Sequence, residues 1–404
     1  MAVTMTPADY GTDNPTPWGD FPVAEYQARV AKAQRLMHAE GIDVLMLAQR
    51  ENVEYFSGFL TGHWNSKTFA CAVLLIPVDR DPVLVLPGFF AGTAAGSTFV
   101  TDHVYFDEPH ARPRDFGLCV LAGLDKLGAR TGRIGVESGE NLAPTWNMID
   151  RDIVFDGLSG ATVVSGAEVI WGCRMIKSPL EVERMRTIVR WSDESILHAR
   201  TLTHQGATEA DVASWCSSKA FELGADGIAF MNIRAGLPRY PCADSIPVER
   251  PVGDSEILLM DIGIKKLGYS TDVAYIGYTG TPTDEHKRYY DAVIRSHEAT
   301  LAAIRPGISS KELFKVGRTV LEDFGEGKYL DMIGHGIGMD VHEPPIITPY
   351  DDRVLEPGMV FAIEPWVYDT ARLGFFCVEE IVVVTEDGFE NLSSIERDEI
   401  WVID

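Results

Sequence analysis

The sequence predicts an α+β protein in which an α/β domain occupies the first half of the chain and a domain of paired strands and helices follows. In the first half, short apolar runs of strand length alternate with segments of helical periodicity. In the second half, capped helix starts alternate with apolar runs that come in adjacent pairs. The 404 residues are enough for two or three domains with sizeable cores.

The first half opens, after a polar leader over residues 1–20, with a helix predicted at residues 23–40. Gly41 follows in the position of a helix C-cap. The apolar positions that define the helical stripe are Tyr26, Val30, Ala33 and Met37. Strands are predicted at residues 42–48, 68–76, 82–86, 133–137 and 152–155. We expect this domain to span residues 21–170.

The second domain, residues 171–404, begins with a strong helix-start signature. Ser178 as the N-cap, Pro179 at the first helical position and Glu181 three residues after the cap make a capping box. The same signature recurs at Thr208 with Asp211 and at Ser309 with Glu312. Strands are predicted at residues 228–235, 256–264, 268–277, 358–368 and 375–385.

Composition excludes several classes of function. The 60 acidic residues outnumber the 35 lysines and arginines and give a formal charge of -25, which repels phosphate backbones and anionic lipid. We therefore expect no nucleic-acid partner, and no membrane span because no stretch approaches about 18 uninterrupted apolar residues. The six cysteines lie far apart without a CxxC pair, and the first 21 residues lack the pattern of a secretory signal. These features predict a cytoplasmic protein with reduced thiols.

Two acidic residues flank a predicted hairpin in the second domain. Asp261 follows the apolar run at 258–260, and Asp272 follows a turn that we expect at 266–267. Such a turn places Asp261 directly across from Asp272, where like charges destabilise a sheet unless a cation lies between them. An exposed hairpin with solvated acids is the alternative, which the apolar lead-in disfavours.

Glu364 and Glu379 form a second candidate pair nearer the C-terminus. Each follows apolar sequence, at residues 358–363 and 376–378, and a loop between the two runs would place the glutamates across from each other. Two buried acid pairs in one domain are hard to explain without a metal.

The glycine-rich segment GHGIG at residues 334–338 places His335 where there is little steric bulk, and His342 follows in the segment HEPP. A lone histidine there would more often be a packed or surface residue, but the four acids change that expectation. Four carboxylates and one imidazole suit divalent Mn, Fe, Co or Zn, and two such ions would neutralise the four charges. Two ions about 3.5–4 Å apart could hold a bridging hydroxide, so the pattern indicates metal-assisted hydrolysis.

These residues, in this order, resemble the pita-bread family of methionine aminopeptidase, aminopeptidase P, prolidase and creatinase. The motifs are GHGIGMDVHEPP, LEPGMVFAIEP and EEIVVVTEDG, and RMIKSPLEVERMR resembles the entry to that family's catalytic domain. The segment EYQARVAKAQRLMHAEGIDVLML resembles the creatinase-type N-terminal domain, which methionine aminopeptidases lack. The resemblance implies a creatinase-like α/β domain followed by a pita-bread catalytic domain, and a homodimer.

The resemblance also implies roles for single residues. The metal-ligand positions of the family fall on Asp261, Asp272, His335, Glu364 and Glu379. His342 matches a histidine that contacts the substrate and moves protons, and Glu364 matches the acid that activates the nucleophile.

The chain departs from the family around these ligands. Xaa-Pro peptidases carry a histidine shortly before the first ligand, but none occurs here from residue 205 to 285, where Arg239–Asp244 occupies the region. Asp331 lies where another histidine is common, and Cys377 replaces an arginine two residues before the last ligand. We therefore expect altered dipeptide specificity, with Asp331 and Arg239 in contact with the substrate.

The leading hypothesis is a dinuclear metal-dependent hydrolase that cleaves a peptide or amide C–N bond in a small substrate, as Xaa-Pro peptidases do. The alternative keeps the fold but acts as a hydrolase or lyase on another small compound, as creatinase, ectoine hydrolase or dimethylsulfoniopropionate lyase does. A catalytically inactive member that works as a binding protein is the third hypothesis, and the five retained ligand positions disfavour it.

Overall fold

The computed structural model describes residues 21–64, 72–106, 115–144, 146–242 and 244–403. The chain divides into two compact units, Met1–Arg174 and Met175–Asp404. Among the described residues, none of the helices combines the length and apolar character that crossing a bilayer requires.

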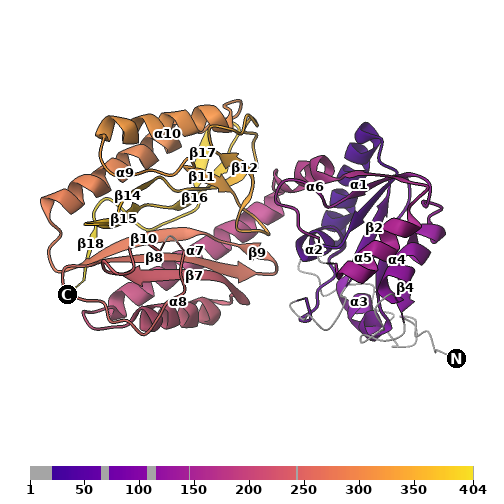
Figure 1. Ribbon diagram of the computed structural model, residues 1–404, viewed down its shortest axis with the longest axis horizontal. Coiled ribbons are helices and arrows are strands. Elements are labelled where there is room, and N and C mark those ends of the chain that lie inside the picture. Colours follow the sequence, from indigo (N-terminus) through magenta and orange to yellow (C-terminus); the bar gives the residue numbers. More distant parts are fainter. Residues whose placement is uncertain (1–20, 65–71, 107–114, 145, 243, 404) are drawn as a thin grey trace. The chain divides into compact units, whose positions relative to one another are not determined.

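The first unit is built on a six-stranded sheet with the order β4-β3-β2-β1-β5-β6 (Figure 1). The β2 strand runs antiparallel to both of its neighbours, and the other neighbouring pairs are parallel. The strands are β1 (Val44–Leu47), β2 (Val73–Pro77), β3 (Val83–Pro87), β4 (Asp102–Phe106), β5 (Arg133–Val136) and β6 (Thr162–Ser165). The helices are α1 (Val23–Glu40), α2 (Arg50–Ser57), η2 (Gly88–Phe90), α3 (Ala91–Ser97), α4 (Asp115–Lys126), α5 (Met148–Gly157) and α6 (Ala167–Arg174). Apolar side chains of β1, β2 and β3 pack against α4 to form the core of this unit.

Most predicted elements of the first unit are confirmed. The helix α1 ends at Gly41, whose φ of 65° is the left-handed conformation that glycine adopts without cost. The strand predicted at residues 152–155 is wrong, because these residues lie within α5. The side chain of Asn147 caps this helix by accepting a hydrogen bond from the backbone N–H of Asp150, and the apolar run is too short to oppose that start. Residues 68–71 of another predicted strand lie outside the described residues.

The second unit contains three sheets, with the orders β18-β10-β8-β7, β12-β11-β13-β16-β17 and β14-β15, and β9 pairs with β8. Its first strands are β7 (Gly227–Ala235), β8 (Ile257–Lys266), β9 (Tyr269–Ser270), β10 (Val273–Thr279), β11 (Gly334–Gly336) and β12 (Glu343–Ile347). The later strands are β13 (Val360–Ile363), β14 (Trp366–Asp369), β15 (Gly374–Cys377), β16 (Glu380–Val384), β17 (Phe389–Asn391) and β18 (Trp401–Ile403). The helices α7 (Pro179–Leu202) and α8 (Glu209–Leu223) lie along one side of these sheets, and α9 (Asp284–Ala303) and α10 (Ser310–Phe324) along the other (Figure 1).

The three predicted capping boxes are all present. Ser178, Thr208 and Ser309 each accept a hydrogen bond from the backbone N–H three residues later, and the acidic side chain at that position accepts one from the cap's own backbone. Each cap stabilises its helix by about 1 kcal/mol, so the sequence signature sets the starts of α7, α8 and α10.

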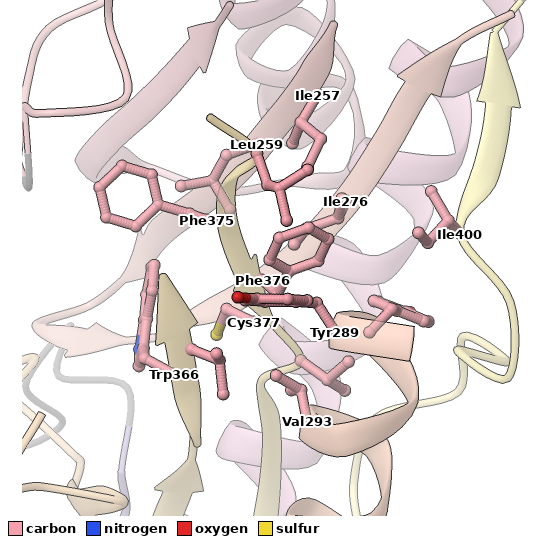
Figure 2. Close-up of a cluster of buried hydrophobic side chains, with 14 of the residues drawn as sticks. Ile257, Leu259, Ile276, Tyr289, Val293, Trp366, Phe375, Phe376, Cys377 and Ile400 are labelled. Carbon is pink, nitrogen blue, oxygen red and sulfur yellow. The ribbon is translucent and has the colours of Figure 1, made fainter. Parts of the chain in front are cut away.

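A cluster of buried apolar side chains holds the strands of the second unit against α9 (Figure 2). The labelled members include Ile257 and Leu259 of β8, Ile276 of β10, Tyr289 and Val293 of α9, and Phe375, Phe376 and Cys377 of β15. Fully burying one such apolar side chain stabilises the fold by about 1.5–3 kcal/mol. The cluster therefore fixes the backbone segments that carry Asp261, Glu364 and Glu379.

We expect Gly336→Ala to lower the free energy of unfolding by about 1–3 kcal/mol, the usual cost of overpacking. A Cβ at this position would lie 2.7 Å from the backbone carbonyl oxygens of Glu343 and Pro344 on the neighbouring strand. Urea denaturation measures the effect. The matched control is Gly388→Ala, where a Cβ meets nothing within 4 Å. Equal stability of the two variants would show that β11 and β12 can separate without loss.

Candidate metal centre

Five acidic and histidine side chains converge inside the second unit. Asp261 lies within β8, Asp272 between β9 and β10, His335 within β11, Glu364 directly after β13 and Glu379 directly before β16. All five are buried, the most exposed at 8%. Their ligand atoms form overlapping triads, in each of which the atoms lie within 4.8 Å of one another: Asp261, Asp272 and Glu379, and His335, Glu364 and Glu379.

The hairpin that carries the first two acids has a different register from the predicted one. The turn lies at Leu267-Gly268, so Asp261 pairs with Ala274 and lies diagonal to Asp272 rather than directly opposite. Both turn residues have positive φ, 46° and 88°, as tight hairpin turns require, and glycine accommodates this without strain. The predicted direct pairing was wrong, but Asp272 precedes Ala274 by two residues and so shares the face of Asp261.

The second acid pair has the predicted register. On one side Ile363 pairs with Glu380, and on the other Trp366 pairs with Cys377. Both ladders therefore place Glu364 opposite Glu379, in a gap between the two sheets. A single backbone β-bridge joins Glu379 to Ala274, and Ala274 is the strand partner of Asp261. The backbone thus lines up Asp261, Ala274 and Glu379 across the unit.

His335 lies between carboxylates of both pairs. Its Nε2 atom is 3.1 Å from Oε1 of Glu364 and 3.5 Å from Oδ2 of Asp272, while Nδ1 lies 3.0 Å from the carbonyl oxygen of Gly336. Burial lowers the pKa of His335, but hydrogen bonds to Asp272 and Glu364 outweigh it and raise the pKa to about 10. Without a metal, a protonated imidazole is thus the cation that these carboxylates favour.

Three of the carboxylates have raised pKa values. Burial is the main cause for Asp261, Asp272 and Glu379, and the neighbouring carboxylates add to it for each. Within the described chain, Oε1 of Glu379 accepts no hydrogen bond. Buried carboxylates that repel one another, gathered around one imidazole, are a donor set that fits divalent metal ions.

His342 lies at the exposed rim of this cluster. Its ring centroid is 4.0 Å from that of His335, and Asp272, His335 and His342 form a further triad of potential ligands. Desolvation of the ring and the nearby His335 lower the pKa of His342 to about 4. At neutral pH this imidazole is therefore uncharged and can donate or accept a hydrogen bond.

Several supporting residues were not identified from the sequence. The Nε1–H of Trp366 donates to Oε2 of Glu364 at 2.7 Å, and the amide of Asn232 donates to Oδ2 of Asp261 at 2.9 Å. Trp366 lies only two residues after Glu364, so its proximity was a usable signal. Asn232 lies on β7, and only the pairing of β7 with β8 brings it opposite Asp261.

A buried ion pair holds the segment that carries His342. Nζ of Lys177 lies 3.0 Å from Oε2 of Glu343, and both side chains are almost fully buried. The other carboxylate oxygen of Glu343 accepts hydrogen bonds from the backbone N–H groups of Met339 and Asp340. The glycine-rich segment is therefore closed into a loop whose end is fixed to Lys177.

Arg239 and Asp331 make contacts other than the predicted ones. Nη2 of Arg239 lies 3.2 Å from Oε2 of Glu209. It also donates hydrogen bonds to the Ser245 hydroxyl and the Ile246 carbonyl. Asp331 is largely exposed and lies 3.2 Å from a guanidinium nitrogen of Arg318. These contacts support the local chain, and contact of either residue with a substrate stays a prediction.

Comparison with known proteins identifies chains that are similar over more than nine-tenths of the sequence. Residues 183–386 match the model of metallopeptidase family M24, and residues 29–176 match the creatinase/prolidase N-terminal domain. The Xaa-Pro dipeptidase of Pyrococcus furiosus is 25% identical over 92% of this chain and 99% of its own. The probable dipeptidase PepE of Mycobacterium tuberculosis is 29% identical over 95% and 98%.

Solved structures agree with these matches. The dipeptidase PepE from Mycobacterium ulcerans superposes with a TM-score of 0.81 at 25% identity and covers 95% of this chain and 100% of its own. The X-Pro aminopeptidase from Thermotoga maritima gives a TM-score of 0.79 at 23% identity, over 93% of this chain and 99% of its own.

We expect added Mn²⁺ to raise the melting temperature more at about pH 8 than at about pH 5. The raised pKa values of Asp261 and Glu379 mean that the folded state keeps protons that the unfolded chain releases near about pH 4. In metal-free protein this contribution to stability is complete below that pH and is lost as the pH rises through the folded-state pKa. A metal ion bound by these carboxylates would compensate their charge at high pH, where the protons are lost.

Calorimetry of EDTA-treated protein with and without Mn²⁺ measures the rise in melting temperature at each of the two pH values. The variant Asp261→Asn/Glu379→Gln, which lacks the two titrating groups, should lose most of the pH difference. An equal gain at both pH values in the unaltered protein would contradict this prediction.

Proposed function

The chain belongs to metallopeptidase family M24, and from this premise we propose that it is a dinuclear metal-dependent hydrolase that cleaves the C–N bond of a small Xaa-Pro-type peptide. Membership also confirms the predicted architecture, a creatinase-type N-terminal domain before a pita-bread catalytic domain. The observation that carries the proposal is the convergence of four buried carboxylates and His335 in overlapping triads.

The five converging residues would hold the metal ions. Two divalent ions would balance the four carboxylate charges, and when bound they would supply Lewis acidity and a hydroxide nucleophile at neutral pH. Asp261, Asp272, His335, Glu364 and Glu379 are the proposed ligands.

The protein's own groups would then move the protons. Glu364 would take the proton of the attacking water and pass it to the leaving amine, and the Trp366 N–H at 2.7 Å keeps its carboxylate oriented for both transfers. His342, uncharged at neutral pH and exposed at the rim, would donate a hydrogen bond to the developing oxyanion of the substrate carbonyl.

A second candidate is a hydrolase or lyase of the same fold for a small compound that is not a peptide. The observation that favours it is the buried Cys377 beside the acid cluster, at a position where the peptidase resemblance implies an arginine. Activity of the metal-loaded protein on Ala-Pro and Leu-Pro, compared with small cyclic or N-alkylated amides, separates the two candidates. Failure to hydrolyse any of these after loading with Mn, Co, Fe or Zn would contradict the hydrolase proposal.

Metal analysis should find about two divalent ions per chain, because one ion would leave about two of the four buried carboxylates uncompensated. The protein is reconstituted with Mn, Co, Fe or Zn, desalted and analysed. Asp272→Asn should bind fewer ions, while the exposed control Asp352→Asn should bind as many as the unaltered protein. A folded sample that retains no ion would contradict the metal assignment.

His335→Ala and Glu364→Gln should both abolish turnover. His335→Ala removes the imidazole ligand and should also weaken metal affinity by about 10-fold or more. Glu364→Gln keeps the side-chain size but removes the charge and the proton acceptor. Turnover and metal titration of both variants, with the exposed His204→Ala as control, test the roles. Normal turnover in either variant would remove that residue from the site.

A further inference from the structure

Arg234 on β7 is a buried cation without a hydrogen-bond partner. Its residue surface is only 1% exposed, and its Nε, Nη1 and Nη2 atoms make no hydrogen bond within the described chain. A guanidinium carries five N–H donors, and burying them without acceptors is costly. A guanidinium that is buried at this cost in free energy indicates that its hydrogen-bond acceptors come from a bound ligand.

The position of Arg234 on its strand directs it toward the metal centre. Arg234 and Asn232 are two residues apart on β7 and so lie on the same face of the sheet. Asn232 pairs with Asp261 across the strands and donates to its carboxylate at 2.9 Å. Arg234 therefore lies on the side of the sheet that carries Asp261.

An aromatic ring holds the guanidinium in place. Its central carbon lies 3.9 Å from the ring centroid of Phe375 on β15. Phe375 packs edge-to-face on Trp366 with ring centroids 5.9 Å apart, and Trp366 donates to the candidate ligand Glu364. A chain of contacts therefore connects the guanidinium to the candidate metal ligands: Arg234 contacts Phe375, Phe375 contacts Trp366, and Trp366 donates a hydrogen bond to Glu364. A ring on the face of a guanidinium leaves the edge with its N–H groups free for a planar anion.

The nearby acids of the described chain make no hydrogen bond with Arg234, although its charge opposes the rise in the pKa of Asp261. Burial lowers the pKa of Arg234 to about 10 and the attraction of Asp261 opposes the shift, so the side chain stays charged at neutral pH. No carboxylate of the described chain lies within ion-pair distance of it, and Asp261 is already bonded to Asn232. Since two divalent ions would balance the four acids, the charge of Arg234 would remain for a ligand.

We propose that Arg234 binds the carboxylate of the substrate, so that this site selects small substrates with a free carboxylate beside the scissile bond. The inference rests on the proposed function for the position of the scissile bond and goes beyond it in naming the substrate class and the residue that selects it. The fork of the guanidinium would accept both carboxylate oxygens, a geometry that lysine cannot reproduce.

Isothermal calorimetry on the full-length, Mn-loaded protein tests the subsite without requiring turnover. The probes are two acid and amide pairs, L-proline with L-prolinamide and N-acetylglycine with its amide. The unaltered protein should bind at least one acid about 10- to 100-fold more tightly than its amide, the factor expected for a charged hydrogen-bonded pair. Arg234→Gln should bind acid and amide equally, and Arg234→Lys should lie between. The matched control is Arg288→Gln, an arginine that also stacks on aromatic rings but is half-exposed.

Kinetics and stability complete the test. If Ala-Pro and its C-terminal amide are hydrolysed, Arg234→Gln should remove the preference for the free acid through KM rather than kcat. If neither is hydrolysed, the proposed function fails while the calorimetry still decides the role of Arg234. The melting temperature of the loaded Arg234→Gln protein should not fall. The inference is overturned if the unaltered protein shows no preference for either acid, or if Arg234→Gln keeps the preference and instead lowers the melting temperature.

Discussion

Four buried carboxylates meet around the imidazole of His335, and the repulsion between them is the constraint on which the second unit depends. Each carboxylate has lost the water that would stabilise its charge, and neighbouring acids raise the pKa values of Asp261 and Glu379 further. The imidazole shared by Asp272 and Glu364 offsets part of this charge. Side chains that repel one another stay together only when the backbone gives them no alternative position.

The backbone supplies that rigidity through three linked ladders. Asp261, Ala274 and Glu379 follow one another across paired segments, and Glu364 lies opposite Glu379 because the ladders on either side share one register. The apolar cluster between β8, β10, β15 and α9 anchors these ladders from behind (Figure 2). Burial in a rigid environment of low dielectric constant strengthens every interaction between charges. Under this condition a site can stabilise the charge of a transition state effectively.

Local patterns in the sequence were sufficient for what depends on neighbouring residues. The capping boxes, the helix α1 and the pairing of Glu364 with Glu379 needed only spacing and apolar character. The register of the hairpin that carries Asp261 differs from the predicted one because the turn includes Gly268, which accommodates a positive φ. Residues 152–155 are helical because the side chain of Asn147 caps the helix that contains them. Sequence could not place Arg234, since its neighbours Phe375 and Asp261 come from strands that only the tertiary fold brings together.

The ion pair of Lys177 and Glu343 sets a limit on how short the catalytic domain can be. Lys177 lies just inside the start of the second unit, and its backbone N–H also bonds to the carbonyl of Gly358. A fragment that begins after this residue keeps all five candidate ligands but removes the ammonium group that pairs with the buried carboxylate of Glu343, and breaking a buried ion pair costs several kcal/mol (roughly 3–5). The loop before His342 would lose its anchor, so the minimal autonomous domain begins at or before Lys177, well ahead of the first candidate metal ligand, Asp261.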